Sequence, residues 1–190
     1  METNSVKHAK ESQNHRSRKR KDIFLFDHEL INKKNMKTLQ QWFDEYSDSH
    51  QNPTNISIHY ICVPLIYLSI IGLLMNIPAG ILDKIFVSHL PVIENWASVI
   101  LIFVLLFYAT LSVELAVRMF FFSLFCLALN SLLSYYLPLL PFSVIVFVLA
   151  WIGQFYGHKV EGKKPSFFKD IQFLLIGPAW VFEKLTKELL

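Results

Sequence analysis

The segment 56–157 most constrains what this chain can fold into, because it is strongly apolar and carries almost no charge. The segment 1–50, in contrast, contains ten Lys or Arg and eight Asp or Glu. Soluble domains spread charged residues along the whole chain, and charge is costly inside a bilayer. With 53% hydrophobic and 17% charged residues overall, the sequence indicates a polar N-terminal arm followed by a membrane-embedded body.

Four apolar segments of this body approach the roughly twenty residues that cross a hydrocarbon core. They are residues 56–75, 96–113, 116–137 and 139–157. Apolar residues recur three and four apart in the segment 24–46, and they alternate with Lys and Glu in the segment 167–190, which predicts interfacial amphipathic helices. The predicted fold is therefore all-α: a polytopic membrane protein with about four transmembrane helices and N- and C-terminal interfacial helices.

The charged residues predict the organisation and orientation of the chain. Residues 1–22 are expected to form a disordered basic arm, and residues 23–190 a single membrane domain. Basic runs such as residues 16–21 also occur in nucleic-acid-binding proteins, but this one fits a cytoplasmic tail. Membrane lipid is therefore expected as a partner, and nucleic acid is not. Basic residues precede the first span and follow the fourth, which places both termini in the cytoplasm. The membrane would be the endoplasmic reticulum in a eukaryote and the cytoplasmic membrane in a bacterium.

Four spans bring the start of the first and the end of the fourth to the same membrane face, and polar residues gather at both ends. They are Tyr46, His50, Asn55 and His59 near the first span, and Gln154, His158 and Glu161 near the fourth. Polar groups at this depth are costly and tend to serve a task. Histidine is the commonest protein metal ligand, and a 2-His-1-carboxylate or all-His set suits Fe(II), with zinc as an alternative. Spacing alone leaves open whether the histidines bind a metal or only satisfy hydrogen bonds at the helix ends.

Two blocks of the sequence, Tyr46–Pro64 and Trp151–Pro165, resemble the two signature blocks of the Mpo1-like family. The resemblance covers about residues 40–185 and leaves the basic arm outside it. It implies an Fe(II)-dependent enzyme of the endoplasmic reticulum membrane that shortens a 2-hydroxy fatty acid by one carbon, in the α-oxidation that accompanies sphingolipid breakdown. The chain departs from the family pattern at Val160 and Ser166, where an aromatic residue and Ala are common, and neither change removes a potential ligand.

The resemblance also implies roles for individual residues. The motif histidines, taken as ligands of Fe(II), are His50, His59 and His158. The other polar positions of the motifs, taken as catalytic, are Tyr46, Asn55, Gln154 and Glu161. The implied substrates are a 2-hydroxy fatty acid and O2. The alternative is a non-catalytic membrane scaffold or lipid-binding protein, which would hold no stoichiometric metal; a transporter is less favoured, because the spans offer little beyond Asn130 to line a polar pathway.

Overall fold

The computed structural model describes residues 37–80, 82, 92–164 and 172–189. The chain divides into two units, Met1–Thr38 and Leu39–Leu190, and the described part of the second unit is all-helical, with no strand. Its helices are α2 (Leu39–Ser47), α3 (Pro53–Met75), α5 (Trp96–Leu111), α6 (Val113–Ser134), α7 (Leu139–Glu161) and α8 (Gln172–Leu189). The expected all-α fold is confirmed for these residues. The basic arm and most of the loop between the first two predicted spans, including His89, lie outside them.

Three of these helices, α3, α6 and α7, are long and apolar enough to cross a membrane. The second expected span, 96–113, is the shorter helix α5, whose 16 residues measure about 24 Å against a hydrocarbon core of about 30 Å. It ends at Leu111 because Ser112 adopts an extended backbone and its hydroxyl accepts a hydrogen bond from Leu115 N at the start of α6. The structure thus supports membrane association, while four crossings stay a prediction.

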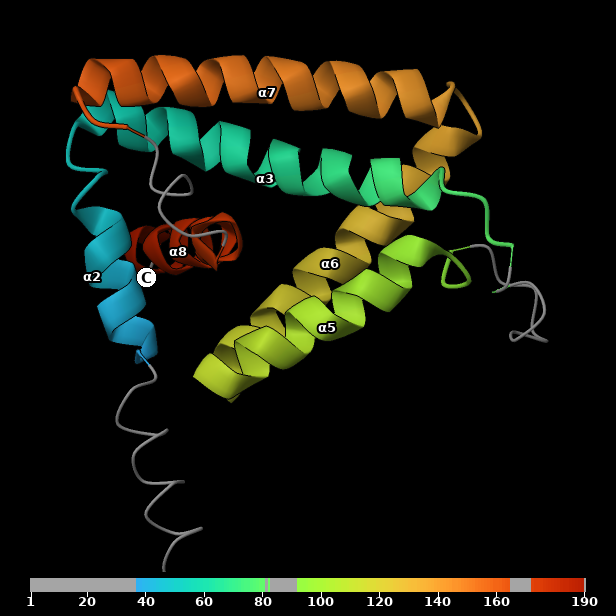
Figure 1. Ribbon diagram of the computed structural model, residues 1–190, viewed down its shortest axis with the longest axis horizontal. Helices are drawn as coiled ribbons and strands as arrows, with labels where there is room; N and C mark the ends of the chain where they lie inside the picture. Colours follow the sequence, from blue (N-terminus) through green and yellow to red (C-terminus); the bar gives the residue numbers. More distant parts are fainter. Residues whose placement is uncertain (1–36, 81, 83–91, 165–171, 190) are drawn as a thin grey trace, which may run out of the picture. The chain divides into compact units, whose positions relative to one another are not determined.

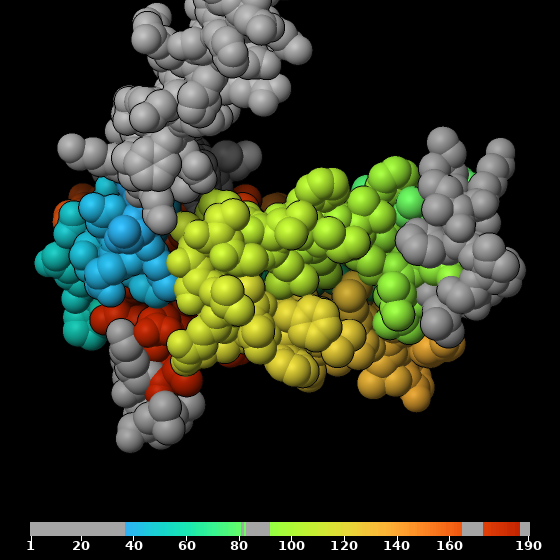
Figure 2. Space-filling model, turned by 90° about the horizontal axis from the view of Figure 1, so that it is seen from below, coloured from blue at the N-terminus to red at the C-terminus, as the bar shows by residue number. Residues whose placement is uncertain are grey.

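Large apolar side chains point outward from the long helices. Phe121 on α6 and Leu149 on α7 are 63% and 62% exposed, and they belong to a broad exposed apolar surface. Exposure of such a large apolar surface to water is unfavourable, whereas the hydrocarbon chains of lipids would cover it. Figure 2 shows α5 and α6 packed side by side along one face of the molecule.

The packing of α3 against α7 positions the polar residues (Figure 1). The two helices run antiparallel, because Gly157 near the end of α7 meets Asn55 near the start of α3, and Ser143 meets Gly72 at the opposite ends. A Cβ added at Gly157 would lie 2.4 Å from Asn55 Oδ1. Gly157 and Gly153 are four residues apart, a small-residue spacing that lets membrane helices approach closely. This close approach places the beginning of α3 directly beside the end of α7.

Both of these helix ends are fixed by local sequence. Asn52 caps α3 by accepting a hydrogen bond from Thr54 N at 2.9 Å, and Pro53 occupies the first helical position, where its missing N–H costs nothing. At the other end, Gly162 has a φ of +74° and terminates α7 just after His158. Tight ends of this kind hold the polar side chains near them in defined positions.

Helix α8 is more deeply packed than a helix lying on a membrane surface. Every residue from 176 to 181 is buried, and Ile176, Ala179 and Val181 are at 0% exposure. It packs against α2 and α3, and its Leu175 carbonyl accepts a hydrogen bond from Tyr108 Oη on α5 at 2.7 Å. Helix α8 therefore closes the side of the bundle that lies next to the polar residues.

Candidate metal centre

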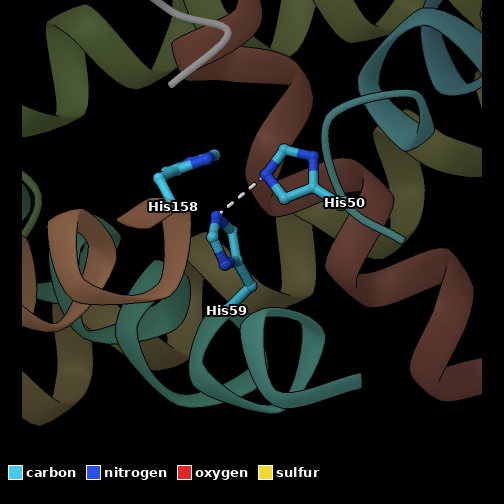
Figure 3. A group of neighbouring side chains, drawn as sticks. All are labelled: His50, His59 and His158. Atoms are coloured by element: carbon cyan, nitrogen blue, oxygen red, sulfur yellow. Dashed lines mark hydrogen bonds between the residues drawn. The ribbon is translucent and has the colours of Figure 1, made fainter. Parts of the chain in front are cut away.

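Three histidines from three separate segments converge at one point (Figure 3). His50 lies in the loop between α2 and α3, His59 in the second turn of α3, and His158 in the last turn of α7. One ligand nitrogen from each ring lies within 4.8 Å of those of the other two. The three side chains are at most 5% exposed. The structure thus brings together the three histidines that the sequence placed at one membrane face.

Backbone hydrogen bonds define how the rings of His50 and His59 are oriented. His50 Nδ1 lies 2.6 Å from the carbonyl oxygen of Tyr46, and His59 Nδ1 lies 2.9 Å from that of Asn55. A carbonyl oxygen can only accept a hydrogen bond, so each Nδ1 carries the proton and donates it. In a neutral imidazole the Nε2 atom then presents a free lone pair. A backbone carbonyl on one ring nitrogen is the usual support for a histidine whose other nitrogen binds a metal.

The two Nε2 atoms face each other at 2.9 Å. A direct hydrogen bond between them requires one ring to take up a second proton and become positively charged. Burial opposes this charge and lowers the pKa of His50 to about 4. Two neutral rings would instead bring two lone pairs together, which is repulsive unless a cation lies between or beside them. The separation of 2.9 Å is short enough for both nitrogens to bind the same metal ion.

His158 supplies the third donor. Its ring centroid lies 4.9 Å from that of His50 and 5.0 Å from that of His59, with the planes close to perpendicular. Its Nδ1 atom is buried and has no hydrogen-bond partner. A buried nitrogen without a partner is costly unless a ligand meets it. The donor set therefore fits a metal ion held by three imidazoles, with further coordination positions open.

Glu161 holds the loop that carries His50. Its two carboxylate oxygens accept hydrogen bonds from the backbone N–H groups of Gln51 and Asn52 at 3.0 and 2.8 Å, and from Asn55 Nδ2 at 3.1 Å. The cluster of possible metal ligands contains the three histidines and not this carboxylate. In this structure Glu161 therefore joins the end of α7 to the start of α3.

Two aromatic rings form a wall beside His50. Tyr46 stacks on it, with ring centroids 4.1 Å apart and planes 8° from parallel, and Trp180 lies 5.5 Å away. Trp180 Nε1 also donates a hydrogen bond to Ser47 Oγ at 2.8 Å, which ties α8 to α2. Burial raises the pKa of Tyr46 well above its usual value, so its phenol keeps its proton at neutral pH.

An apolar cavity of about 170 Å³ adjoins the histidines. Its polar lining consists of His158, Gln154, Tyr46 and Tyr67, and apolar side chains from α3, α5 and α8 line most of the rest. Gln154 is 5% exposed, its side chain contacts His59, and its Nε2 atom has no hydrogen-bond partner. The cavity thus has a polar end at the histidine cluster and an apolar body.

Sequence reasoning selected the polar residues of this site but not its aromatic wall. All seven selected residues lie in or beside the cluster, although Glu161 meets the loop and Asn55 rather than the histidines. Trp180 is not among the predicted residues, because the alternation of apolar residues with Lys and Glu in the segment 167–190 indicates a surface helix. The missed signal was its apolar run around Ile176 and Val181, which is fully buried here.

The fold and site define a class: a helical, membrane-associated protein with a buried cluster of three histidines able to hold a metal. The chain belongs to the Mpo1-like family, because the family model described as "2-hydroxy-palmitic acid dioxygenase Mpo1-like" matches residues 36–189, most of its length. The comparisons with curated proteins and with solved structures found no match.

Proposed function

We propose that this chain is an Fe(II)-dependent dioxygenase that shortens 2-hydroxy fatty acids by one carbon. The observation that carries the proposal is the pair of facing Nε2 atoms of His50 and His59, with the ring of His158 beside them. Family membership supports the reaction type and the class of substrate. An all-imidazole donor set with open positions is compatible with Fe(II) and leaves room for substrate and O2.

In this proposal His50, His59 and His158 hold the metal. When bound there, Fe(II) would supply Lewis acidity to the substrate oxygens and electrons for the reaction with O2. The overall reaction is R–CH(OH)–COOH + O2 → R–COOH + CO2 + H2O. The bond between C1 and C2 breaks, both carbons are oxidised, and O2 is reduced, so no other oxidant is needed.

The chain's other polar residues would act on the head group of the substrate or on the position of the histidines. Gln154 presents a buried N–H without a partner at the polar end of the cavity, which suits a substrate carboxylate or 2-hydroxyl oxygen. Tyr46, as a neutral phenol on the cavity wall, can donate a second hydrogen bond. Asn55 and Glu161 would hold His50 and His59 in position through the contacts between α3 and α7.

The enclosure of the site also serves the reaction. Histidines at most 5% exposed lie in a region from which bulk water is excluded, where polar interactions with a substrate are stronger. We further propose four membrane crossings with both termini in the cytoplasm, in the endoplasmic reticulum if the host is a eukaryote, and a role in sphingolipid-derived fatty acid breakdown. A 2-hydroxy fatty acid in the adjoining leaflet would then present its carboxylate at the depth of the histidines.

The test is O2-dependent turnover of 2-hydroxypalmitate by protein reconstituted anaerobically with Fe(II). Wild type should release the acid that is one carbon shorter together with CO2, and His59→Ala and His158→Ala should lose at least a hundredfold in rate. His28→Ala is the matched control, because His28 lies outside the family match. Wild-type protein that is folded and loaded with iron but gives no product would contradict the proposal and favour a lipid-binding scaffold.

A further inference from the structure

The cavity beside the histidines continues along α3, away from the metal centre. The α3 side chains that line it run in order from Val63 through Ile66 and Ile70 to Leu74. His59 is eleven residues before Ile70 and fifteen before Leu74, which places these side chains about 16 and 22 Å from it along the helix axis. The cavity therefore follows the second half of α3.

The far end of the cavity lies where α5 begins. Trp96 Nε1, in the first turn of α5, donates a hydrogen bond to the carbonyl of Pro78 just after α3, at 3.0 Å. Ile100 and Leu101, one turn further along α5, line the cavity together with Leu74. The far end is thus built from aliphatic side chains of two helices.

The two ends of the cavity favour different chemical groups in a bound molecule. At the near end, Gln154 Nε2 is buried without a partner, and the residue is only 5% exposed. This N–H group needs a hydrogen-bond acceptor, such as an oxygen atom of a ligand. The aliphatic remainder suits a linear hydrocarbon. A free fatty acid with a small oxygenated head satisfies both ends.

We propose that this cavity holds the acyl chain of the substrate and that Leu74, with Ile100 and Leu101, sets the longest chain accepted. This inference rests on the proposed function for the identity of the head group. A larger side chain at the far end takes up part of the volume of about 170 Å³ and shortens the space open to the chain. A side chain enlarged at Ile70 would stop the acyl chain nearer the metal than one enlarged at Leu74.

The test compares Leu74→Phe, Leu74→Ala and Ile70→Phe with wild type. The matched control is Leu65→Phe, the same substitution on the same helix at a position that is 38% exposed and does not line the cavity. Each metal-free protein in lipid nanodiscs is loaded with radiolabelled 2-hydroxypalmitate, which is then displaced with shorter and longer homologues. The turnover of the same homologues is measured on the Fe(II)-loaded proteins.

Leu74→Phe should disfavour the longest homologues relative to the shortest by about tenfold or more. Ile70→Phe should move the preference to still shorter chains, Leu74→Ala should move it to longer ones, and Leu65→Phe should match wild type. Coinciding length profiles in all five proteins would overturn the inference. Leu74→Ala removes atoms rather than adding them, so its chain-length profile still tests the inference if the Phe variants do not fold.

The two readouts separate this inference from the proposed reaction. Shifted displacement profiles without turnover in any protein would support the cavity assignment and reject the dioxygenase. Turnover with unshifted profiles would support the dioxygenase and reject the assignment of Leu74 to chain-length selection.

Discussion

His50 and His59 point their Nε2 atoms at each other across 2.9 Å, although both rings have already donated their Nδ1–H groups to backbone carbonyls. In a neutral pair this geometry opposes two lone pairs in a buried site. A cation that binds both lone pairs would remove this repulsion, and His158 adds a third possible ligand nitrogen within 4.8 Å. The arrangement is therefore organised before the metal binds, which lowers the cost of reorganisation on binding.

Replacing Glu161 with Gln distinguishes a carboxylate that positions the loop from one that binds the metal. The neutral amide keeps the shape, but its NH2 group cannot accept, so at least one of the hydrogen bonds from Gln51 N, Asn52 N and Asn55 Nδ2 is lost. The variant should still bind one metal ion per chain, with an affinity about 10 to 100 times lower. Competition with a chelator of known affinity measures this. Complete loss of metal, at the level of His59→Ala, would show that Glu161 is itself a ligand.

Two glycine variants should separate helix packing from metal binding. Gly157→Ala puts a Cβ 2.4 Å from Asn55 Oδ1, and Gly153→Ala puts one 2.6 Å from Cys62 Sγ. Each overpacks the contact of α3 with α7 and should cost about 1–3 kcal/mol of stability. Only Gly157→Ala displaces Asn55, whose carbonyl supports His59, so only this variant should also lose metal affinity.

Thermal unfolding in detergent and chelator competition check this pair. Equal losses of metal affinity in both variants would mean that the site responds to general loosening of the bundle rather than to the position of Asn55.

The depressed pKa of His50 predicts an acid-sensitive metal-free protein. The folded state keeps this ring neutral down to about pH 4, whereas the unfolded chain binds a proton near its ordinary value of 6.5. Between these values the unfolded state binds more protons, so the contribution of His50 to stability is full above pH 6.5 and is lost as the pH falls toward 4. The loss across this window is at most about 3 kcal/mol.

Unfolding midpoints of the metal-free protein from pH 7.5 to 4.5 measure this loss. Wild type should lose stability more steeply than His50→Gln, whose side chain does not titrate. The control His28→Gln should follow wild type. Identical slopes for wild type and His50→Gln would show that His50 is already charged, or accessible to water, in the folded state.

In the expected topology of four crossings the chain returns to the face from which it started, so His50 and His158 are predicted at one depth even though they are far apart in sequence. The start of α3 was also predictable from Pro53. The other four polar residues at these span ends could also be picked out from the sequence, whereas their catalytic roles were implied by resemblance to a family.

Other features depend on tertiary contacts that no local pattern encodes. The segment around Trp180 contains Pro178, Lys184 and Glu183, which is typical of an interfacial helix, yet it packs against α2 and α3 and is buried from 176 to 181. The partners of the Glu161 carboxylate are backbone N–H groups of a loop more than a hundred residues away. The early end of α5 depends on Ser112 capping α6.

The most direct test of the account is the number of Fe(II) ions bound per chain by protein purified in detergent and loaded anaerobically, with His50→Ala, His59→Ala and His158→Ala measured alongside wild type and His28→Ala. The account predicts one ion per chain in wild type and in His28→Ala, and near-complete loss in each of the three cluster variants while they remain folded. Folded wild-type protein that binds no iron, or full binding in any one of the cluster variants, would contradict it.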